Sequence, residues 1–205
     1  MIIALDGPAA SGKGTLSKKL ASEFGLPYLD TGLLYRAVGY QALQQNIQAD
    51  ALYDLEKIAM KIELEAIDQT ELRSSEVAQM ASKIASIPQV REALIKAQRN
   101  FANQAKGAIL DGRDIGTVIA PHADYKFYIT ASAEVRAERR HKDLVKSNEN
   151  ISFDDVLKDI KERDARDQNR KTAPAKQAED AHLIDTTNLC IEEAYSAVMS
   201  IINET

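Results

Sequence analysis

A glycine-rich loop between a short apolar run and an amphipathic stretch constrains this chain more than any other feature. The apolar run Ile2–Asp6 predicts a strand, and the recurrence of Leu16, Leu20 and Phe24 four residues apart predicts a helix after the loop. The loop consists of Gly7, Pro8, Ala9, Ala10, Ser11, Gly12, Lys13, Gly14 and Thr15. Glycines let successive backbone N–H groups point at one centre, and the positive end of the helix strengthens their field. We therefore predict a phosphate-binding loop that holds ATP, with Lys13 at the β- and γ-phosphates.

Further apolar runs alternate with amphipathic stretches along the rest of the chain. They predict strands at 27–30, 108–111, 125–130 and 182–186. The amphipathic stretches predict helices at about 33–46, 76–86, 88–101, 132–146, 153–171 and 191–203. Strands joined by crossover helices are typical of a parallel sheet covered by helices on both faces. We therefore expect a three-layer α/β fold around a parallel sheet of these strands.

The spacing of the strands also predicts how the chain is organised. Residues 31–107 are too many for one crossover helix, so we interpret about 33–104 as a helical insertion within a single domain of residues 1–205. The insertion is expected to be able to move separately from the rest of the domain. The segment Thr172–Asp180, which contains Pro174, is expected to be a mobile loop rather than a domain boundary.

Charge and cysteine content exclude several classes of protein. Lys plus Arg total 26 against 31 for Asp plus Glu, and a net charge of -5 provides no overall basic field for nucleic acid. Cys190 is the only cysteine, which excludes an intramolecular disulfide and a thiolate zinc cluster. No apolar run approaches the 20 or so residues that span a bilayer. We expect a cytoplasmic, monomeric protein that acts on small molecules, with neither a nucleic-acid nor a membrane partner.

The residue after the loop lysine favours one class of nucleotide enzyme. Gly14 stands where many phosphate-binding loops carry a serine or threonine that binds magnesium, and the hydroxyl comes one place later, at Thr15. This form is more similar to nucleoside monophosphate kinases than to GTPases, and the chain has no Asn-Lys-x-Asp motif for guanine. We therefore favour a transferase over a nucleotide-operated switch. No side chain is expected to bind Mg²⁺ directly; ATP phosphates and water hold it, and Asp111 contacts it through water.

The ends of the second and third strands carry the residues expected on the acceptor side. Ligands in open α/β sheets bind beyond the carboxyl ends of the strands. Thr31 and Arg36 follow the strand at 27–30, and Arg36 is a candidate clamp for an acceptor phosphate. The strand at 108–111 ends in Asp111, with Arg113 and Asp114 directly after it.

Arginines in the two helices after residue 132 predict a positive cage around the transferred phosphoryl group. Phosphoryl transfer depends on positioning and on positive charge around the γ-phosphate, which Lys13 alone supplies only weakly. Arg139 or Arg140 on the first of these helices, and Arg163 or Arg170, are expected to complete the cage. A helix at about 153–171 would place Arg163, Asp167 and Arg170 on one face.

Taken together, these segments resemble one enzyme family in order through nearly the whole chain. The matching segments are Gly7–Thr15, Leu29–Gly32 with Tyr35 and Arg36, Ala81 and Ser82, Pro88 with Val90–Leu94, Asp111–Val118, and Lys161–Asp164 through Asn169 and Arg170. They are similar to the corresponding motifs of bacterial cytidylate kinases. The resemblance implies a P-loop NTPase fold with a five-stranded parallel core, an acceptor-binding insertion at about 33–104 and a short lid at about 132–152. It also implies transfer of the γ-phosphoryl group of ATP to CMP or dCMP with Mg²⁺.

The resemblance further assigns roles to individual residues. It implies that Arg36 and Arg113 bind the CMP phosphate, that Thr31, Arg91 and Asp114 read the cytosine, and that Ser82, Arg163 and Asp167 contact the pentose. Arg170 would lie near the transferring phosphates or the acceptor. One departure concerns a β-hairpin that the family often carries before the Ser82 segment, for which only about residues 63–75 are available here. The alternatives are another small-acceptor kinase, acting on UMP and CMP or on AMP, and a nucleotide-operated switch.

Overall fold

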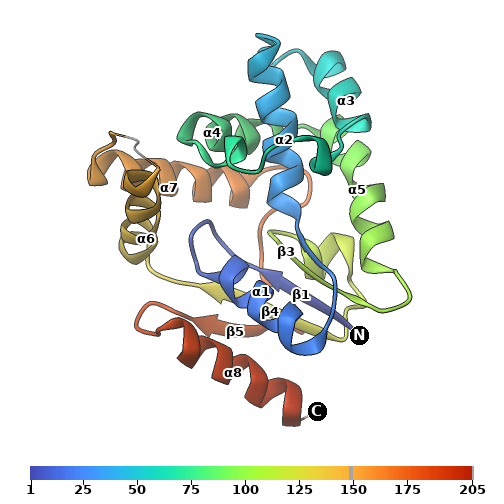
Figure 1. The fold of residues 1–205 in the computed structure, drawn as a ribbon, viewed down its shortest axis with the longest axis vertical. Helices are drawn as coiled ribbons and strands as arrows, with labels where there is room; N and C mark the ends of the chain where they lie inside the picture. The colour runs from blue at the N-terminus through green and yellow to red at the C-terminus, as the bar shows by residue number, and fades with distance from the viewer. Residues whose placement is uncertain (148–149, 205) are drawn as a thin grey trace.

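Five parallel strands form one sheet at the centre of the protein (Figure 1). The structure, a computed structural model, describes residues 1–147 and 150–204. The strands are β1 (Ile2–Asp6), β2 (Tyr28–Asp30), β3 (Ala108–Gly112), β4 (Tyr125–Thr130) and β5 (His182–Asp185), and their order across the sheet is β2-β3-β1-β4-β5. All four neighbouring pairs are parallel, with Ile2 of β1 opposite Ala108 of β3 and Ile3 opposite Tyr125 of β4. The carboxyl ends of the strands therefore meet at one edge of the sheet.

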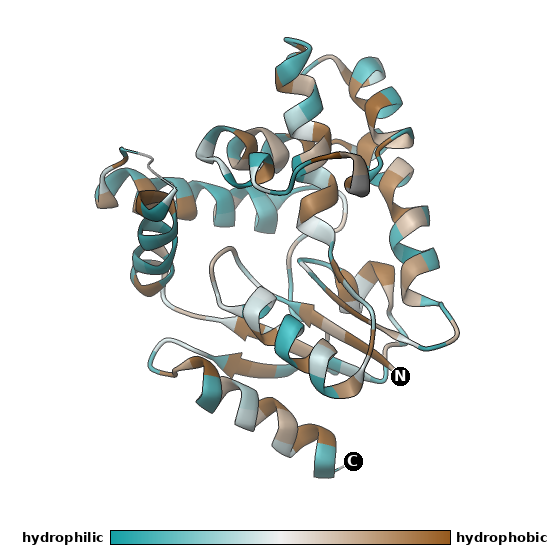
Figure 2. Ribbon diagram, in the orientation of Figure 1, coloured by the Kyte–Doolittle hydropathy of each residue, from teal (hydrophilic) through white to brown (hydrophobic). Residues whose placement is uncertain are grey.

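Helices cover both faces of the sheet. Apolar side chains of β1 point alternately to the two faces, so both faces must be buried. Ile3 and Leu5 pack against α1 (Lys13–Phe24) and α8 (Ile191–Glu204), whereas Ala4 packs toward the other face. That second face is covered by the end of α5 (Pro88–Ala102) and by a π-helical turn, Ile115–Ile119. Figure 2 shows the strands as largely hydrophobic, which suits burial on both faces. The predicted three-layer α/β fold with a parallel five-stranded sheet is confirmed.

The helices between β2 and β3 have an apolar core of their own. They are α2 (Thr31–Gln44), α3 (Leu52–Met60), α4 (Ser75–Ile84) and α5. Val38, Leu55, Ile84 and Val90 are fully buried in this core, and Leu29 of β2 packs against it. Residues 63–75, the segment predicted to be too short for a hairpin insert, contain two 3₁₀ turns, Leu64–Ala66 and Glu71–Arg73. The predicted limits of the insertion, about 33–104, stay a prediction.

A helix pair rises beside this insertion at the carboxyl edge of the sheet. It consists of α6 (Ala133–Lys146) and α7 (Phe153–Asn169), which share a small core of Ala137, Leu144, Val156 and Ile160. In Figure 1, α7 runs beneath α4, and Figure 2 shows α7 as a largely hydrophilic helix. The predicted lid at about 132–152 includes residues 148–149, which lie outside the described residues. The helix pair therefore brings charged side chains to the edge where the strands end.

Several element boundaries differ from those predicted, each for a physical reason. The helix expected at 33–46 begins at Thr31, because the Asp30 side chain caps it by accepting from the Gly32 N–H over 2.9 Å. Helix α3 was not predicted; it is short and depends on burial of Leu55 against the neighbouring helices. The helix expected to reach 171 ends at Asn169, and Arg170 has extended backbone (φ -63°, ψ 141°). The prediction that Arg170 lies on the face of that helix is therefore wrong.

Within the described residues, no helix combines the length and the apolar character that crossing a bilayer requires.

Candidate active site

The glycine-rich loop joins the end of β1 to the start of α1 and lies tightly against β4. Gly7 has a φ of 146°, and a Cβ atom there would collide with the Ile129 carbonyl oxygen. Gly12 caps α1 with a φ of 90°, a conformation that L side chains rarely adopt. Together with Ala10, whose φ is 59°, these residues turn the loop around the amino end of α1. The loop thus has the curled backbone that a phosphate site needs.

Lys13, the first residue of α1, is a buried cation at this loop. Its side chain is 7% exposed, and its Nζ donates to the Pro8 carbonyl over 3.2 Å. Burial, together with the charge of Arg113, lowers the pKa of Lys13 to about 8, although the charges of Asp111 and Asp30 oppose this. An anion bound at the loop would reverse this effect by stabilising the ammonium form.

A cavity of about 520 Å³, here called the loop cavity, opens at this lysine. It is lined by the loop from Ala10 to Thr15, by Arg139 and Lys142 of α6, and by the segment from Thr186 to Ile191 after β5. Arg139 is held at its wall, donating to the Thr186 hydroxyl over 3.0 Å and to the Thr186 carbonyl over 2.8 Å. The volume falls within the range of small-molecule sites, about 300–1,000 Å³. The loop cavity therefore has room for a nucleotide with its phosphates at Lys13.

Asp111 lies beside Gly14 near the amino end of α1. Its Oδ2 accepts from the Tyr28 hydroxyl over 2.6 Å, and a Cβ atom on Gly14 would lie 3.5 Å from the same oxygen. Burial raises the pKa of Asp111 to about 6, and the negative charge of Asp30 contributes. A side chain at Gly14 would therefore contact this carboxylate directly. Oxygen donors of this kind are the ligands that Mg²⁺ prefers, directly or through water.

Replacing Asp111 with asparagine is expected to stabilise the protein more at high pH than at low pH. Because the pKa of Asp111 rises from 3.8 to about 6 on folding, the wild-type protein loses stability as the pH rises through about 6. Asparagine carries no charge at any pH and keeps an oxygen acceptor for Tyr28. The unfolding free energy of the variant relative to wild type should therefore improve by about 2 kcal/mol between pH 4 and pH 8. Denaturant unfolding of both proteins measures this difference, and a difference independent of pH would contradict the assignment.

A second pocket lies around Asp114, where β3 gives way to the π-helical turn. Asp114 is 6% exposed and pairs with Arg91, which is 1% exposed, and with Arg170 Nη2 at 3.3 Å. This Asp114 pocket is lined by Thr31, Gly32, Tyr35, Ala81, Ser82, Ala85, Arg91, Gly112, Arg113, Asp114, Arg163, Asp167 and Arg170. Its volume of about 40 Å³ is far below that of a nucleotide. A nucleotide can therefore enter this pocket only if the surrounding helices or side chains move.

Asp6 holds the backbone that carries Asp114 in place. The Asp6 carboxylate, at the end of β1, accepts from the N–H groups of Ile115 and Gly116 over 2.7 and 2.8 Å. Burial raises the pKa of Asp6 to about 6, although the two backbone hydrogen bonds oppose that rise. One short strand therefore leads into the glycine-rich loop and also fixes the start of the π-helical turn.

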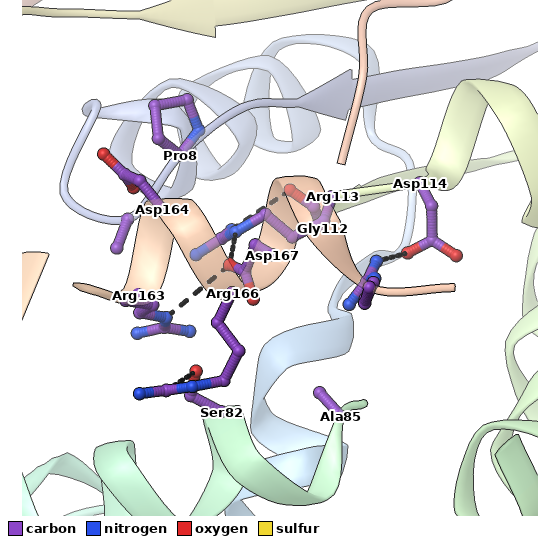
Figure 3. A network of polar contacts seen from close by, with 12 residues as sticks. Pro8, Ser82, Ala85, Gly112, Arg113, Asp114, Arg163, Asp164, Arg166 and Asp167 are labelled. Atoms are coloured by element: carbon purple, nitrogen blue, oxygen red, sulfur yellow. Dashed lines mark hydrogen bonds and ion pairs between the residues drawn. The ribbon is translucent and has the colours of Figure 1, made fainter. Parts of the chain in front are cut away.

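Asp167 lies between Arg113 and Arg163 and contacts both, as Figure 3 shows. Its Oδ2 accepts from Arg113 Nε over 3.0 Å and lies 3.8 Å from Arg163 Nε. Burial alone would raise the pKa of Asp167, but the positive charges of Arg113 and Arg163 lower it overall. This carboxylate is therefore ionised and pairs with guanidinium groups on two elements.

Next to the Asp114 pocket lies a cavity of about 400 Å³, here called the arginine cavity. Its cationic lining residues are Arg36, Lys83, Arg140, Arg163 and Arg166. Burial, with the positive charges of nearby arginines, lowers the pKa of Arg36 to about 10 and that of Arg163 to about 9. Asp143, Asp159 and Glu162 also line the cavity, so its cations exceed its carboxylates by two, and a bound anion would be favoured.

The structure brings most of the predicted site residues together, but it places the two arginines predicted for the lid in different cavities. Arg139 lines the loop cavity, whereas the adjacent Arg140 lines the arginine cavity and donates to the Arg73 carbonyl over 3.0 Å. Arg36 lines the arginine cavity and Arg113 the Asp114 pocket, while Arg163 and Ser82 line both. Arg170 reaches Asp114 although it lies beyond α7.

Sequence reasoning missed three residues of the site. Arg166 donates to Ser82, Tyr28 donates to Asp111, and Asp6 holds the turn after Asp114. Arg166 lies three residues after Arg163 on α7, so helical spacing alone would have identified it. The partners of Tyr28 and Asp6 lie 83 and 109 residues away, and no local pattern indicates them.

Comparison of the sequence with known families and proteins gives one consistent result. The family model described as cytidylate kinase matches residues 3–204. The cytidylate kinase of Caulobacter vibrioides is 50% identical over 203 residues, which cover 99% of this chain and 95% of the relative. The cytidylate kinase of Xanthobacter autotrophicus is 50% identical over 202 residues, which cover 98% of this chain and 97% of the relative.

Solved structures similar to this one are more distant in sequence. A shikimate kinase from Bacteroides thetaiotaomicron superimposes with a TM-score of 0.54 at 12% identity, covering 99% of this chain and 98% of the other. An uncharacterized protein from Eubacterium ventriosum gives a TM-score of 0.59 at 16% identity, covering 100% and 99% of the two chains. At such identities the similarity concerns the fold alone.

Proposed function

The chain belongs to the cytidylate kinase family and is a phosphotransferase, and we propose that its site transfers the γ-phosphoryl group of ATP to the phosphate of CMP or dCMP. One observation carries the assignment of the site. The glycine-rich loop with Lys13 and the buried Asp114 with its two arginines lie at the same edge of one sheet, on either side of Asp167 and its arginines. This order matches a donor nucleotide and an acceptor nucleotide meeting phosphate to phosphate.

On the donor side, the loop cavity would hold ATP. The residues that would bind its phosphates are Gly7, Pro8, Ala9, Ala10, Ser11, Gly12, Lys13, Gly14 and Thr15. Backbone N–H groups at the amino end of α1 suit the phosphate oxygens, and Lys13 supplies a positive charge at the γ-phosphate. Arg139 lines the same cavity and adds a second cation on the donor side.

The site also suits Mg²⁺ held mainly by the nucleotide. Asp111 would hold the ion through water, because its carboxylate lies beside the amino end of α1 and Gly14 carries no hydroxyl that could bind the ion directly. When bound, the ion would neutralise charge on the β- and γ-phosphates. Within residues 1–147 and 150–204, no group of three or more histidine, cysteine or acidic side chains forms a metal site.

On the acceptor side, each part of CMP has a chemically suitable partner. Arg36 and Arg113 would bind the phosphate, since guanidinium groups match phosphate oxygens in two contacts. Ser82, Arg163 and Asp167 would contact the pentose. Asp114, with Arg91 and Thr31, would read the base, because the 4-amino group of cytosine is a donor that a carboxylate accepts and uracil lacks.

The transfer step would need little covalent work from the protein. An oxygen of the CMP phosphate forms a bond to the γ-phosphorus of ATP, and the bond from that phosphorus to the β,γ-bridging oxygen breaks, which releases ADP. The attacking oxygen is already anionic, so no side-chain base is required. Lys13, Arg163 and Arg170 would stabilise the charge on the transferring oxygens, and exclusion of water would strengthen that effect.

An acceptor panel tests this proposal. We expect ADP release from ATP and Mg²⁺ to be fast with CMP and dCMP, slow with UMP, AMP and GMP, and near background without an acceptor or with excess EDTA. A preference for AMP, or equal use of UMP and CMP, would replace the assignment with another small-acceptor kinase. A rate of ATP turnover that is the same with and without every acceptor would support a nucleotide-operated switch instead.

A further inference from the structure

Arg166 reaches across from α7 to α4 and contacts a residue of the Asp114 pocket. Its Nη1 donates to Ser82 Oγ over 2.6 Å, and Figure 3 shows the two side chains directed toward each other. Arg166 is half-buried, and Ser82 is only 3% exposed. The two residues are 84 positions apart in the chain, so the contact joins the helical insertion to the helix pair.

This contact determines what the Ser82 hydroxyl offers to a ligand. A serine hydroxyl has one proton and two lone pairs, whereas a guanidinium group can only donate. Ser82 Oγ is therefore the acceptor toward Arg166 and keeps its proton for another partner. The Asp167 carboxylate, an acceptor with a lowered pKa, lines the same pocket. A donor and an acceptor in one pocket match a sugar hydroxyl, which both accepts and donates.

Arg166 uses its charge differently from the arginines around it. Arg113 and Arg170 pair with carboxylates at 3.0 and 3.3 Å, but Arg166 forms no ion pair within residues 1–147 and 150–204. A hydrogen bond from a charged donor is about twice as strong as one between neutral groups. The Ser82 hydroxyl is therefore held more firmly than a neutral partner would hold it.

A second bridge between the same two helices supports this arrangement. Gln79 Nε2 on α4 donates to Asp159 Oδ2 on α7 over 2.9 Å. Gln79 lies three residues before Ser82 and Asp159 seven before Arg166, so each pair shares a helix face. Both bridges line the arginine cavity; the Gln79 bridge is exposed to solvent, whereas the Arg166 bridge is partly buried.

We propose that Arg166 is a positioning residue for the pentose of the acceptor nucleotide, acting through Ser82. It orients the Ser82 hydroxyl toward the sugar and holds α4 against α7, without touching the reacting phosphates. This role rests on the proposed function, since it assumes that the Asp114 pocket receives CMP.

Steady-state kinetics of Arg166→Met test the proposal. We expect KM for CMP to rise by about tenfold to a hundredfold, the effect of losing a charge-assisted hydrogen bond, while KM for ATP stays unchanged. The acceptor 2′,3′-dideoxy-CMP lacks the sugar hydroxyls, so with it the variant and the wild type should behave alike. Lys158→Met, at an exposed position of α7, is the matched control and should leave both constants unchanged.

A double-mutant cycle with Ser82→Ala separates positioning from direct contact. If Arg166 acts through Ser82, adding Arg166→Met to Ser82→Ala should change KM for CMP little further. Additive effects, an unchanged KM for CMP, or an equal loss with dideoxy-CMP would each overturn the proposal. Arg166→Gln keeps a neutral donor and should fall between wild type and Arg166→Met; failure of both variants to fold would assign Arg166 to the fold instead.

The wild-type result separates failure of this inference from failure of the proposed function. If wild-type protein does not phosphorylate CMP, the proposed function is wrong and the inference falls with it. If the wild type does phosphorylate CMP and Arg166→Met matches it, only the inference is wrong.

Discussion

Replacing Lys13 with methionine is expected to reduce kcat for CMP phosphorylation by about a hundredfold to a thousandfold, the usual effect of losing one group that stabilises transition-state charge. Lys13 is the buried cation of the glycine-rich loop, and the backbone N–H groups that remain bind phosphate but carry no full charge. Methionine keeps the length and the apolar stem of the side chain. Rapid-quench measurement of CDP formation at saturating substrates reports the change directly.

Lys13→Met should also fold at least as well as the wild type at neutral pH. Burial lowers the pKa of Lys13 to about 8, which means that the charged form weakens the folded state below that pH. Thermal unfolding at pH 7 should therefore show an equal or higher midpoint. Lys18→Met, on the exposed face of α1, provides the control for a lost lysine. A variant with near-normal turnover would remove the loop from the mechanism.

Replacing Asp114 with alanine is expected to cause the largest loss of stability of any change at the acceptor side. Arg91 and Arg170 are 1% and 9% exposed, so removing their shared carboxylate leaves buried positive charge without compensation. Breaking a buried ion pair from one side typically costs about 3–5 kcal/mol. This loss is a large part of the roughly 5–15 kcal/mol that stabilises a folded domain. Guanidinium unfolding at pH 7 measures it, and a loss below about 1 kcal/mol, as for an exposed pair, would contradict the structure.

Asp114→Asn separates base recognition from stability. Asparagine keeps a hydrogen-bond acceptor for the arginines and fits the same space, so its unfolding free energy should lie between those of the wild type and of Asp114→Ala. Its amide can donate to the O4 of uracil as well as accept from cytosine. The ratio of kcat/KM for CMP to that for UMP should therefore fall by about tenfold to a hundredfold, the effect of losing a charge-assisted hydrogen bond. Unchanged discrimination would remove Asp114 from base reading.

The sequence was most informative where chemistry and local structure coincide. The strand, the glycine-rich loop and the helix after it could be predicted, because their residues are consecutive and each has a local conformational reason. The parallel sheet could be predicted from the alternation of apolar runs and amphipathic stretches. Asp111, Arg113 and Asp114 could be assigned to the sheet edge, because they directly follow a buried strand.

Contacts between segments far apart in the chain could not be predicted from local sequence patterns. Arg139 and Arg140 are neighbours in sequence, but they point into different cavities because successive residues on a helix differ in direction. Arg170 pairs with Asp114 from an extended segment beyond α7. Helix periodicity therefore placed Arg170 near the acceptor side correctly, but on a helix face where it does not lie. The π-helical turn depends on a carboxylate that lies 109 residues earlier, at Asp6.

The fate of the γ-phosphoryl group tests the central claim most directly. Purified protein would be incubated with ATP labelled in the γ-phosphate, Mg²⁺ and CMP, and the labelled products would be separated. The account predicts that the label appears in CDP in step with ADP formation, and that Lys13→Met loses this transfer. Label recovered as inorganic phosphate, whether or not CMP is present, would contradict the account and make the protein an ATP hydrolase.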